Sequence, residues 1–102
     1  MTEEEKQKGA EERWDDRGPA NEARAIGVIT VLFSEYALGD KINELFHDYS
    51  GYMVGRMGMP YRDGNVYIIN VTLDGPRGEI DGLFHKLSIL PGVQAKVTFA
   101  EI

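Results

Sequence analysis

The stretch AIGVITVLF, at residues Ala25–Phe33, is apolar at nearly every position. A β-strand that is apolar on both faces is typical of the centre of a sheet whose two faces are both covered. We therefore expect this strand to lie in the middle of a sheet. At 102 residues, the chain has room for one domain around that sheet and not for two.

Two later segments repeat their apolar residues with the spacing of an amphipathic helix. The first follows a break at Ser34–Gly39 and is predicted to end near Ser50-Gly51, with the short carboxylate of Asp40 capping its N-terminus. Its apolar stripe consists of Leu38, Ile42, Leu45, Phe46 and Tyr49. The second helix is predicted from the i, i+3, i+4, i+7 spacing of Ile80, Leu83, Phe84 and Leu87.

A hairpin is expected in the middle of the chain. Tyr52–Pro60 predicts a second strand, in which Gly55 and Gly58 indicate a bulge or a close approach by another backbone or a ligand. The Asp-Gly pair within Arg62–Asn65 then predicts a hairpin turn into a third strand, Val66–Leu73.

Turn residues set the remaining boundaries. Asp74-Gly75-Pro76 is predicted to end the third strand, and Pro91-Gly92 is predicted to turn the chain into the fourth. The fourth strand, Val93–Phe99, alternates apolar and polar residues, as a strand with one solvent-facing side does. The order predicts an α+β, ferredoxin-like βαββαβ sandwich, with a four-stranded antiparallel sheet and two helices on one face.

This fold leaves one face of the sheet without helices. Each βαβ half crosses over right-handed, which places both helices on the same side and the first and third strands in the centre. A large bare apolar patch on a soluble protein marks an interface, so we expect self-association as a homodimer. The helix-free face is predicted to carry either Ile26, Val28 and Leu32 or Ala25, Ile29 and Val31, beside Val66 and Ile68.

Residues 1–23 differ in composition from residues 24–102. They hold eight acidic and four basic side chains, and Trp14 is their only large apolar group. Such a segment buries too little apolar surface to offset its ordering entropy. We predict a disordered acidic N-terminal tail over 1–23 and one ferredoxin-like regulatory domain over 24–102. The alternative for the tail is a docking arm in which Trp14 fits a pocket on a partner.

Charge and composition exclude several classes of protein. The net charge of −6 argues against direct nucleic-acid binding, for which a basic face supplies most of the affinity. The lack of cysteine excludes disulfides and thiolate metal sites. No apolar run approaches the ~20 residues of a membrane span, and the chain opens on polar residues rather than on a signal peptide. We therefore expect no membrane association and a cytoplasmic location.

The sequence shows no arrangement for catalysis or for a cofactor. His47 and His85 are the only histidines, and without cysteine ligands we interpret them as surface residues, so no metal is expected. Neither a phosphate-binding glycine motif nor a serine nucleophile motif is present. The loop Ser34–Lys41 lacks the arginine that acylphosphatases of the same element order need after the first strand. We therefore predict a protein that is not an enzyme and carries no cofactor.

The most unusual segment is Gly55–Arg62, on a predicted edge strand. Glycine permits close approach, arginine offers a planar fork to a carboxylate or phosphate, and methionine adapts to irregular apolar shapes. We predict that a ligand or partner binds here, with Asn43 contributing from the first helix. The candidate site consists of Gly55, Arg56, Met57, Gly58, Met59, Pro60, Tyr61, Arg62 and Asn43. The alternative is a bulged edge strand whose arginines are solvated.

Four strings carry a resemblance to a known family: RAIGVI at 24–29, KINEL at 41–45, YMVGRMGMPY at 52–61 and LSILPGVQAK at 87–96. Through them the domain resembles the iron-only hydrogenase system regulators, which are small ACT-like proteins. The resemblance implies a ferredoxin-like fold and a regulatory role. It does not imply the nickel sensing of related repressors, because this chain lacks their cysteine and most of their histidine ligands.

Two hypotheses for the function follow. The first is a regulatory domain that senses a small molecule. The second is a dimeric interaction module that docks on a partner protein without a ligand.

Overall fold

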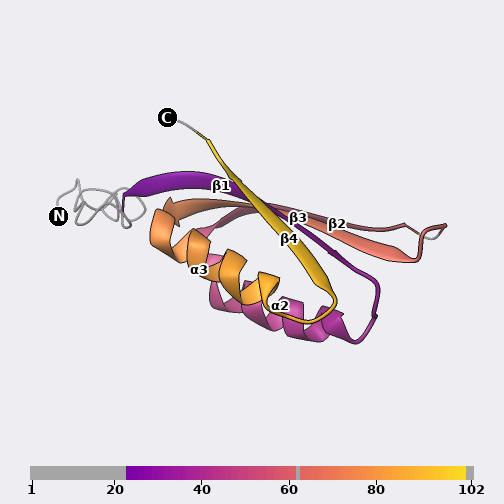
Figure 1. Cartoon of the computed structure of the whole chain (residues 1–102). Coiled ribbons are helices and arrows are strands. Elements are labelled where there is room, and N and C mark those ends of the chain that lie inside the picture. The colour runs from indigo at the N-terminus through magenta and orange to yellow at the C-terminus, as the bar shows by residue number, and fades with distance from the viewer. Residues whose placement is uncertain (1–22, 62, 101–102) are drawn as a thin grey trace.

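The computed structural model of the chain describes residues 23–61 and 63–100. The predicted tail, Ala23 excepted, and Arg62 of the candidate site lie outside these residues. The described elements follow the predicted order (Figure 1). They are β1 (Arg24–Phe33), α2 (Leu38–Asp48), the short 3₁₀ helix η2 (Ser50–Tyr52), β2 (Met53–Tyr61), β3 (Val66–Pro76), α3 (Arg77–Ser88) and β4 (Val93–Phe99).

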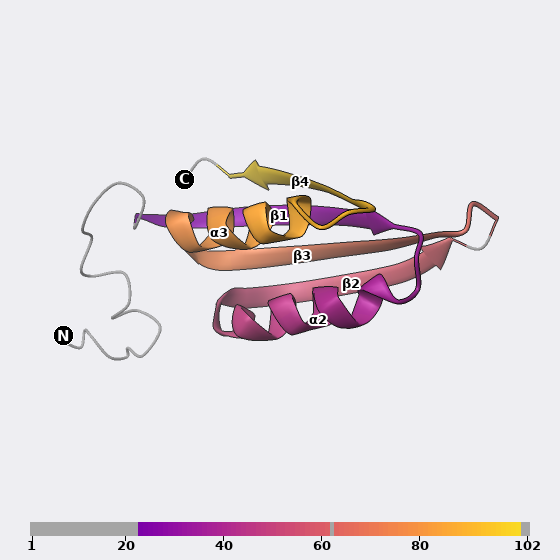
Figure 2. The same ribbon diagram turned by 60° about the horizontal axis from the view of Figure 1, so that its bottom comes forward.

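The four strands form one antiparallel sheet in the order β2-β3-β1-β4. The two central strands, β1 and β3, pair without interruption from Arg24 opposite Pro76 to Phe33 opposite Tyr67. Both helices lie on the same face of the sheet, with α2 alongside β2 and α3 alongside β1 (Figures 1 and 2). This arrangement confirms the ferredoxin-like, ACT-like fold and the central places of the first and third strands.

The core lies between the sheet and the two helices. On the central strands the fully buried side chains are those of Ile29, Val31, Val71 and Leu73. They pack with the helix residues Ile42, Phe46, Ile80, Leu83 and Leu87. Burying one such side chain contributes roughly 1.5–3 kcal/mol, so these contacts fix which face of the sheet the helices cover. The sequence left two sets of β1 residues possible for the helix-free face. The structure places Ile26, Val28 and Leu32 there.

The predicted end of the third strand is wrong. β3 continues through Asp74-Gly75-Pro76, because β1 begins early enough to pair with all three residues. Gly75 also fits beneath the ring of Tyr52, where a β-carbon would lie only 2.7 Å from a ring atom. The sequence shows the turn-forming residues but not the partner strand that holds them extended.

One other local prediction is wrong, and one is confirmed. Asp40 does not cap α2; the N-cap position is Ala37 and carries no side-chain hydrogen bond, while Asp40 lies in the first helical turn. There its carboxylate still interacts favourably with the helix dipole. The hairpin predicted after β2 is present, and Asn65 within it adopts a left-handed backbone conformation, with φ of 55°.

Candidate functional site

The helix-free side of the sheet, which we call the open face, is set by the strand register. Residues paired across antiparallel strands share a face, so Met57 lies beside Asn70, Met59 beside Ile68, and Tyr61 beside Val66. The exposed apolar side chains of this face are Val28 (39% exposed), Met57 (60%), Met59 (45%) and Tyr61 (55%). Its half-buried apolar side chains are Ile26, Leu32, Val66 and Ile68.

The polar groups of the open face are mostly uncharged or paired with one another. The Thr30 hydroxyl donates to Asn70 Oδ1 at 2.9 Å, in the centre of the face. Arg24 donates two hydrogen bonds of 3.1 Å to the carboxylate of Asp74, which raises the pKa of Arg24. Besides Arg24 and Asp74, the charged residue on the described part of this face is Lys96, on the edge strand β4.

The predicted site segment is divided between the two faces of the sheet. Met57, Met59 and Tyr61 point to the open face, whereas Arg56 and Gly58, paired with Val71 and Ile69, belong to the helix side. The bulge expected near the glycines is confirmed, because the register shifts between Met53 and Gly55 and leaves Val54 as the extra residue. Alternation along a strand, which is a local property, thus separates residues that are adjacent in sequence.

Arg56 and Asn43 come together, as predicted for the helix contribution. A terminal guanidinium nitrogen of Arg56 donates to Asn43 Oδ1, and the guanidinium carbon lies 4.9 Å from the centre of the Phe46 ring. The two ion pairs of the described residues are Arg24 with Asp74 and Arg77 with Asp81, so no described carboxylate pairs with Arg56. A neutral amide and an aromatic ring therefore hold this cation in place without neutralising it.

A shallow hollow of about 200 Å³ lies beside Arg56 on the edge of the sheet. A β-carbon built at Gly58 would have no atom nearer than 3.9 Å, so the space over this glycine is open. Gly58 also has no positive φ that would require glycine. The hollow is lined by Phe33, Arg56, Gly58, Met59, Pro60, Tyr67, Ile68 and Ile69.

Two aromatic contacts near the site were not predicted from the sequence. Phe33 and Tyr67 stack at 5.2 Å between ring centres, and the largely exposed Tyr36 lies 6.2 Å from Tyr67. The strand register explains the first contact, because Phe33, the last residue of β1, pairs with Tyr67, the second residue of β3. This pairing was the signal that could have predicted it.

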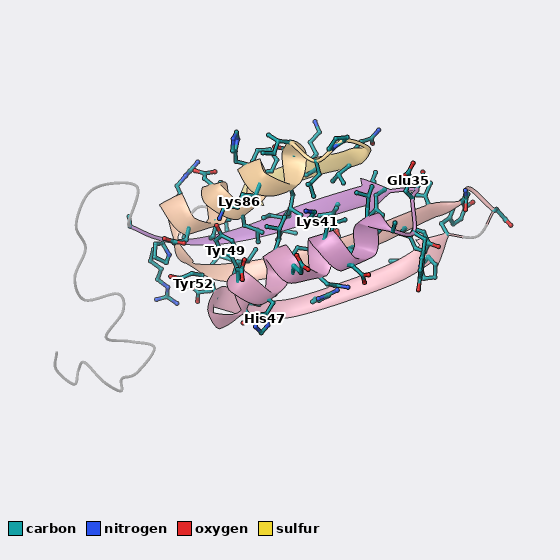
Figure 3. All side chains as sticks on the ribbon, turned by 90° about the horizontal axis from the view of Figure 1, so that it is seen from below. Glu35, Lys41, His47, Tyr49, Tyr52 and Lys86 are labelled. Atoms are coloured by element: carbon teal, nitrogen blue, oxygen red, sulfur yellow. The ribbon has the colours of Figure 1, made fainter. Side chains whose placement is uncertain are left out.

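The two helices meet through a lysine and a tyrosine. Lys86 Nζ lies 5.1 Å from the centre of the Tyr49 ring (Figure 3). Its interaction with the Tyr49 hydroxyl raises the pKa of Lys86. Tyr49 is buried, so this contact fastens α3 to α2 rather than forming part of an open site.

His47 and His85 lie on different helices and both are exposed. Over residues 23–61 and 63–100, no group of three or more His, Cys, Asp or Glu side chains is placed to hold a metal ion. Within the same residues, neither helix has the length and apolar character needed to cross a membrane.

Comparison with known proteins identifies relatives of the whole domain. Residues 25–97 match the family model described as "TM1266-like: Iron-only hydrogenase system regulator, putative". A similar solved structure is that of the uncharacterized protein TM1266 from Thermotoga maritima. It has a TM-score of 0.73 and 26% sequence identity, and the match covers 76% of this chain and 99% of that one. No curated protein matches the chain.

Two enzymes share the fold over a small part of their length. A formyltetrahydrofolate deformylase from Pseudomonas putida KT2440 gives a TM-score of 0.53 at 14% identity, over 72% of this chain and 28% of the enzyme. A homoserine dehydrogenase from Thiobacillus denitrificans gives 0.57 at 17% identity, over 80% of this chain and 18% of the enzyme. These likenesses concern the fold alone.

Proposed function

The chain belongs to the family of iron-only hydrogenase system regulators. We propose that it acts as a regulator in the form of a homodimer, whose two copies contact each other through their open faces. The observation that carries this proposal is the composition of the open face, which is apolar and almost free of unpaired charge. No catalytic step is part of the proposal.

Depletion of charge distinguishes the centre of an interface from ordinary protein surface, and methionine and aromatic residues are enriched there. The open face fits this description, with Met57, Met59 and Tyr61 exposed together on one strand. Strands about 4.8 Å apart, rising about 3.3 Å per residue, give a four-stranded sheet of ten residues an area of roughly 600 Å². Two such faces bury roughly 1,200 Å², which reaches the range of specific interfaces.

A second copy suits this face better than a strongly charged partner does. The whole chain carries a net charge of −6, yet Arg24 and Asp74 neutralise each other on the open face and Lys96 lies on the edge strand. Two identical open faces therefore meet without like-charge repulsion at their centres. The acidic and basic residues of α2 and α3 stay on the outside of such a dimer.

Sedimentation at micromolar concentration tests the proposal. We expect the native chain to be a dimer and Val28→Lys to be a folded monomer, because the new ammonium group lies on a central strand of the open face. Ile89→Lys is the matched control, since Ile89 is 63% exposed but lies at the end of α3, and this variant is expected to dimerise. A monomeric native chain, or a dimeric Val28→Lys variant, contradicts the proposal.

Sensing of a small ligand is a second candidate function, favoured by the fixed guanidinium of Arg56 beside an open hollow. A thermal-shift screen with amino acids, nucleotides and divalent metals tests it. A ligand at 100 times its Kd stabilises the fold by about 2.7 kcal/mol, which raises the Tm by several degrees for a domain of this size. If no compound in the screen raises the Tm, the result favours a protein that docks on a partner without a ligand.

A further inference from the structure

We propose that the hollow beside Gly58 binds a small monocarboxylate with an apolar tail. Arg56 holds the carboxylate, and the tail rests against Ile69 and Tyr67. The proposal rests on the second candidate function, ligand sensing, and does not depend on self-association. Three features of the described residues carry it.

The first feature is a cation that is already positioned. Arg56 is fixed from one side by Asn43 and from another by the ring of Phe46, so its side chain loses little further freedom when it binds an anion. Arg77 shows the contrast. Its guanidinium lies 3.9 Å from the Phe99 ring but also 3.8 Å from the carboxylate of Asp81. Arg56 has the same aromatic support without the carboxylate.

The second feature is the room over Gly58. Gly75 is glycine because a side chain would collide with Tyr52, whereas neither packing within the chain nor backbone angle accounts for Gly58. Glycine weakens an edge strand and is found where a ligand or another backbone approaches closely, and Gly58 is the glycine that lines the hollow beside Arg56. The hollow of about 200 Å³ is open to solvent and is large enough for a small hydrocarbon tail to enter.

The third feature is the charge around the hollow, which selects the class of anion. The lining beyond Arg56 is aromatic or aliphatic apart from glycine, so it suits a hydrocarbon tail. On the other side of Asn43, the outer surface of α2 carries Asp40, Glu44 and Asp48. These carboxylates repel a dianion more strongly than a monoanion, which favours a single carboxylate over a phosphate or a dicarboxylate.

An NMR titration of the ¹⁵N-labelled full chain with 4-methylpentanoate tests the proposal. The acid is expected to shift the amide resonances of residues 55–59 and the side-chain amide of Asn43. Its neutral isostere 4-methylpentanamide and inorganic phosphate, which has no tail, are expected to leave them in place. Arg56→Gln is expected to weaken binding of the acid by about tenfold, the scale of one lost charge-assisted hydrogen bond.

Arg77→Gln is the matched control and is expected to bind the acid as the native chain does. Gly58→Ala, which fits without a clash, is expected to weaken binding while the Tm stays equal or rises. The proposal is overturned if the acid shifts none of these resonances at millimolar concentration, if the amide binds equally well, or if Arg56→Gln has no effect.

If Arg56→Gln fails to fold, the comparison of acid and amide on the native chain still decides the matter. Sedimentation of the same samples shows separately whether the dimer forms, so failure of the ligand site and failure of self-association are told apart.

Discussion

The two faces of one sheet differ in what completes them. On the helix side, Ile29, Val31, Val71 and Leu73 are fully buried because α2 and α3 cover them. On the open face, the equally apolar β1 residue Val28 stays 39% exposed. The apolar run of β1 therefore supplies two apolar faces, and the described part of the chain covers one of them. An apolar strand therefore predicts burial on both sides, but it does not say which molecule provides the cover.

Truncation on the helix side is expected to have the largest effect. Leu73→Ala should lower the free energy of unfolding by about 2–5 kcal/mol, because it leaves a cavity among fully buried side chains. Ile68→Ala, on the open face of the same strand, should cost about 1 kcal/mol in the monomer. Urea unfolding at low protein concentration measures both values. Equal losses would mean that the two faces are equally well packed in a single chain.

The second prediction concerns the thermal stability of the dimer. If the open face is covered by a second copy, each tenfold rise in protein concentration should raise the Tm of the native chain by a few degrees. Val28→Lys should abolish this dependence, and Ile89→Lys should retain it. Calorimetry over a hundredfold range of protein concentration checks this prediction. A native Tm that stays constant over this range would argue against a dimer formed through the open faces.

The third prediction uses the exposed methionines of the open face. Hydrogen peroxide transfers one oxygen atom to a thioether, forming methionine sulfoxide and water, and the product is polar. Oxidation of Met57 and Met59 should therefore lower the dimer fraction severalfold in sedimentation. The double variant Met57→Leu, Met59→Leu keeps the volume and apolar character of the side chains and should resist peroxide. Equal sensitivity of both proteins would place these methionines outside the interface.

The smallest effect is expected at the ion pair between Arg24 and Asp74. Their side chains are 41% and 26% exposed, so Asp74→Asn should cost at most about 1 kcal/mol. The raised pKa of Arg24 means that its contribution is present below its ordinary pKa and is lost only as the pH rises beyond that value. The cost of Asp74→Asn should therefore not change between about pH 6 and pH 9, as urea unfolding at several pH values can show. A cost that varies across this range would indicate that another group titrates with the pair.

Local patterns were sufficient for the fold. Helical spacing from Leu38 to Tyr49, alternation from Val93 to Phe99 and the right-handed crossover rule led to the observed order of strands and the common side of the helices. The family resemblance was confirmed by the match over residues 25–97. The bulge beside Gly55 and the proximity of Asn43 to the candidate strand were also anticipated.

Local patterns failed where a distant partner changes what a residue does. Asp74-Gly75-Pro76 forms turns in many sequences, but here β1 holds it extended and Tyr52 covers it. The candidate segment from Gly55 to Arg62 was treated as one site, yet the strand directs Met57 and Met59 to one face of the sheet and Arg56 to the other.

The four strands, the two α-helices and their order could be predicted from the sequence, because hydrophobic periodicity is a property of near neighbours along the chain. The short helix η2 was not predicted. The side of β1 that the helices cover is visible only in the folded structure, because both sides are apolar and the choice depends on how all the strands and helices pack together. The folded structure also shows that Arg56 is held by Asn43 and Phe46 beside the open space over Gly58. That arrangement depends on the strand register and on the position of α2, which are fixed by contacts between residues far apart in the sequence.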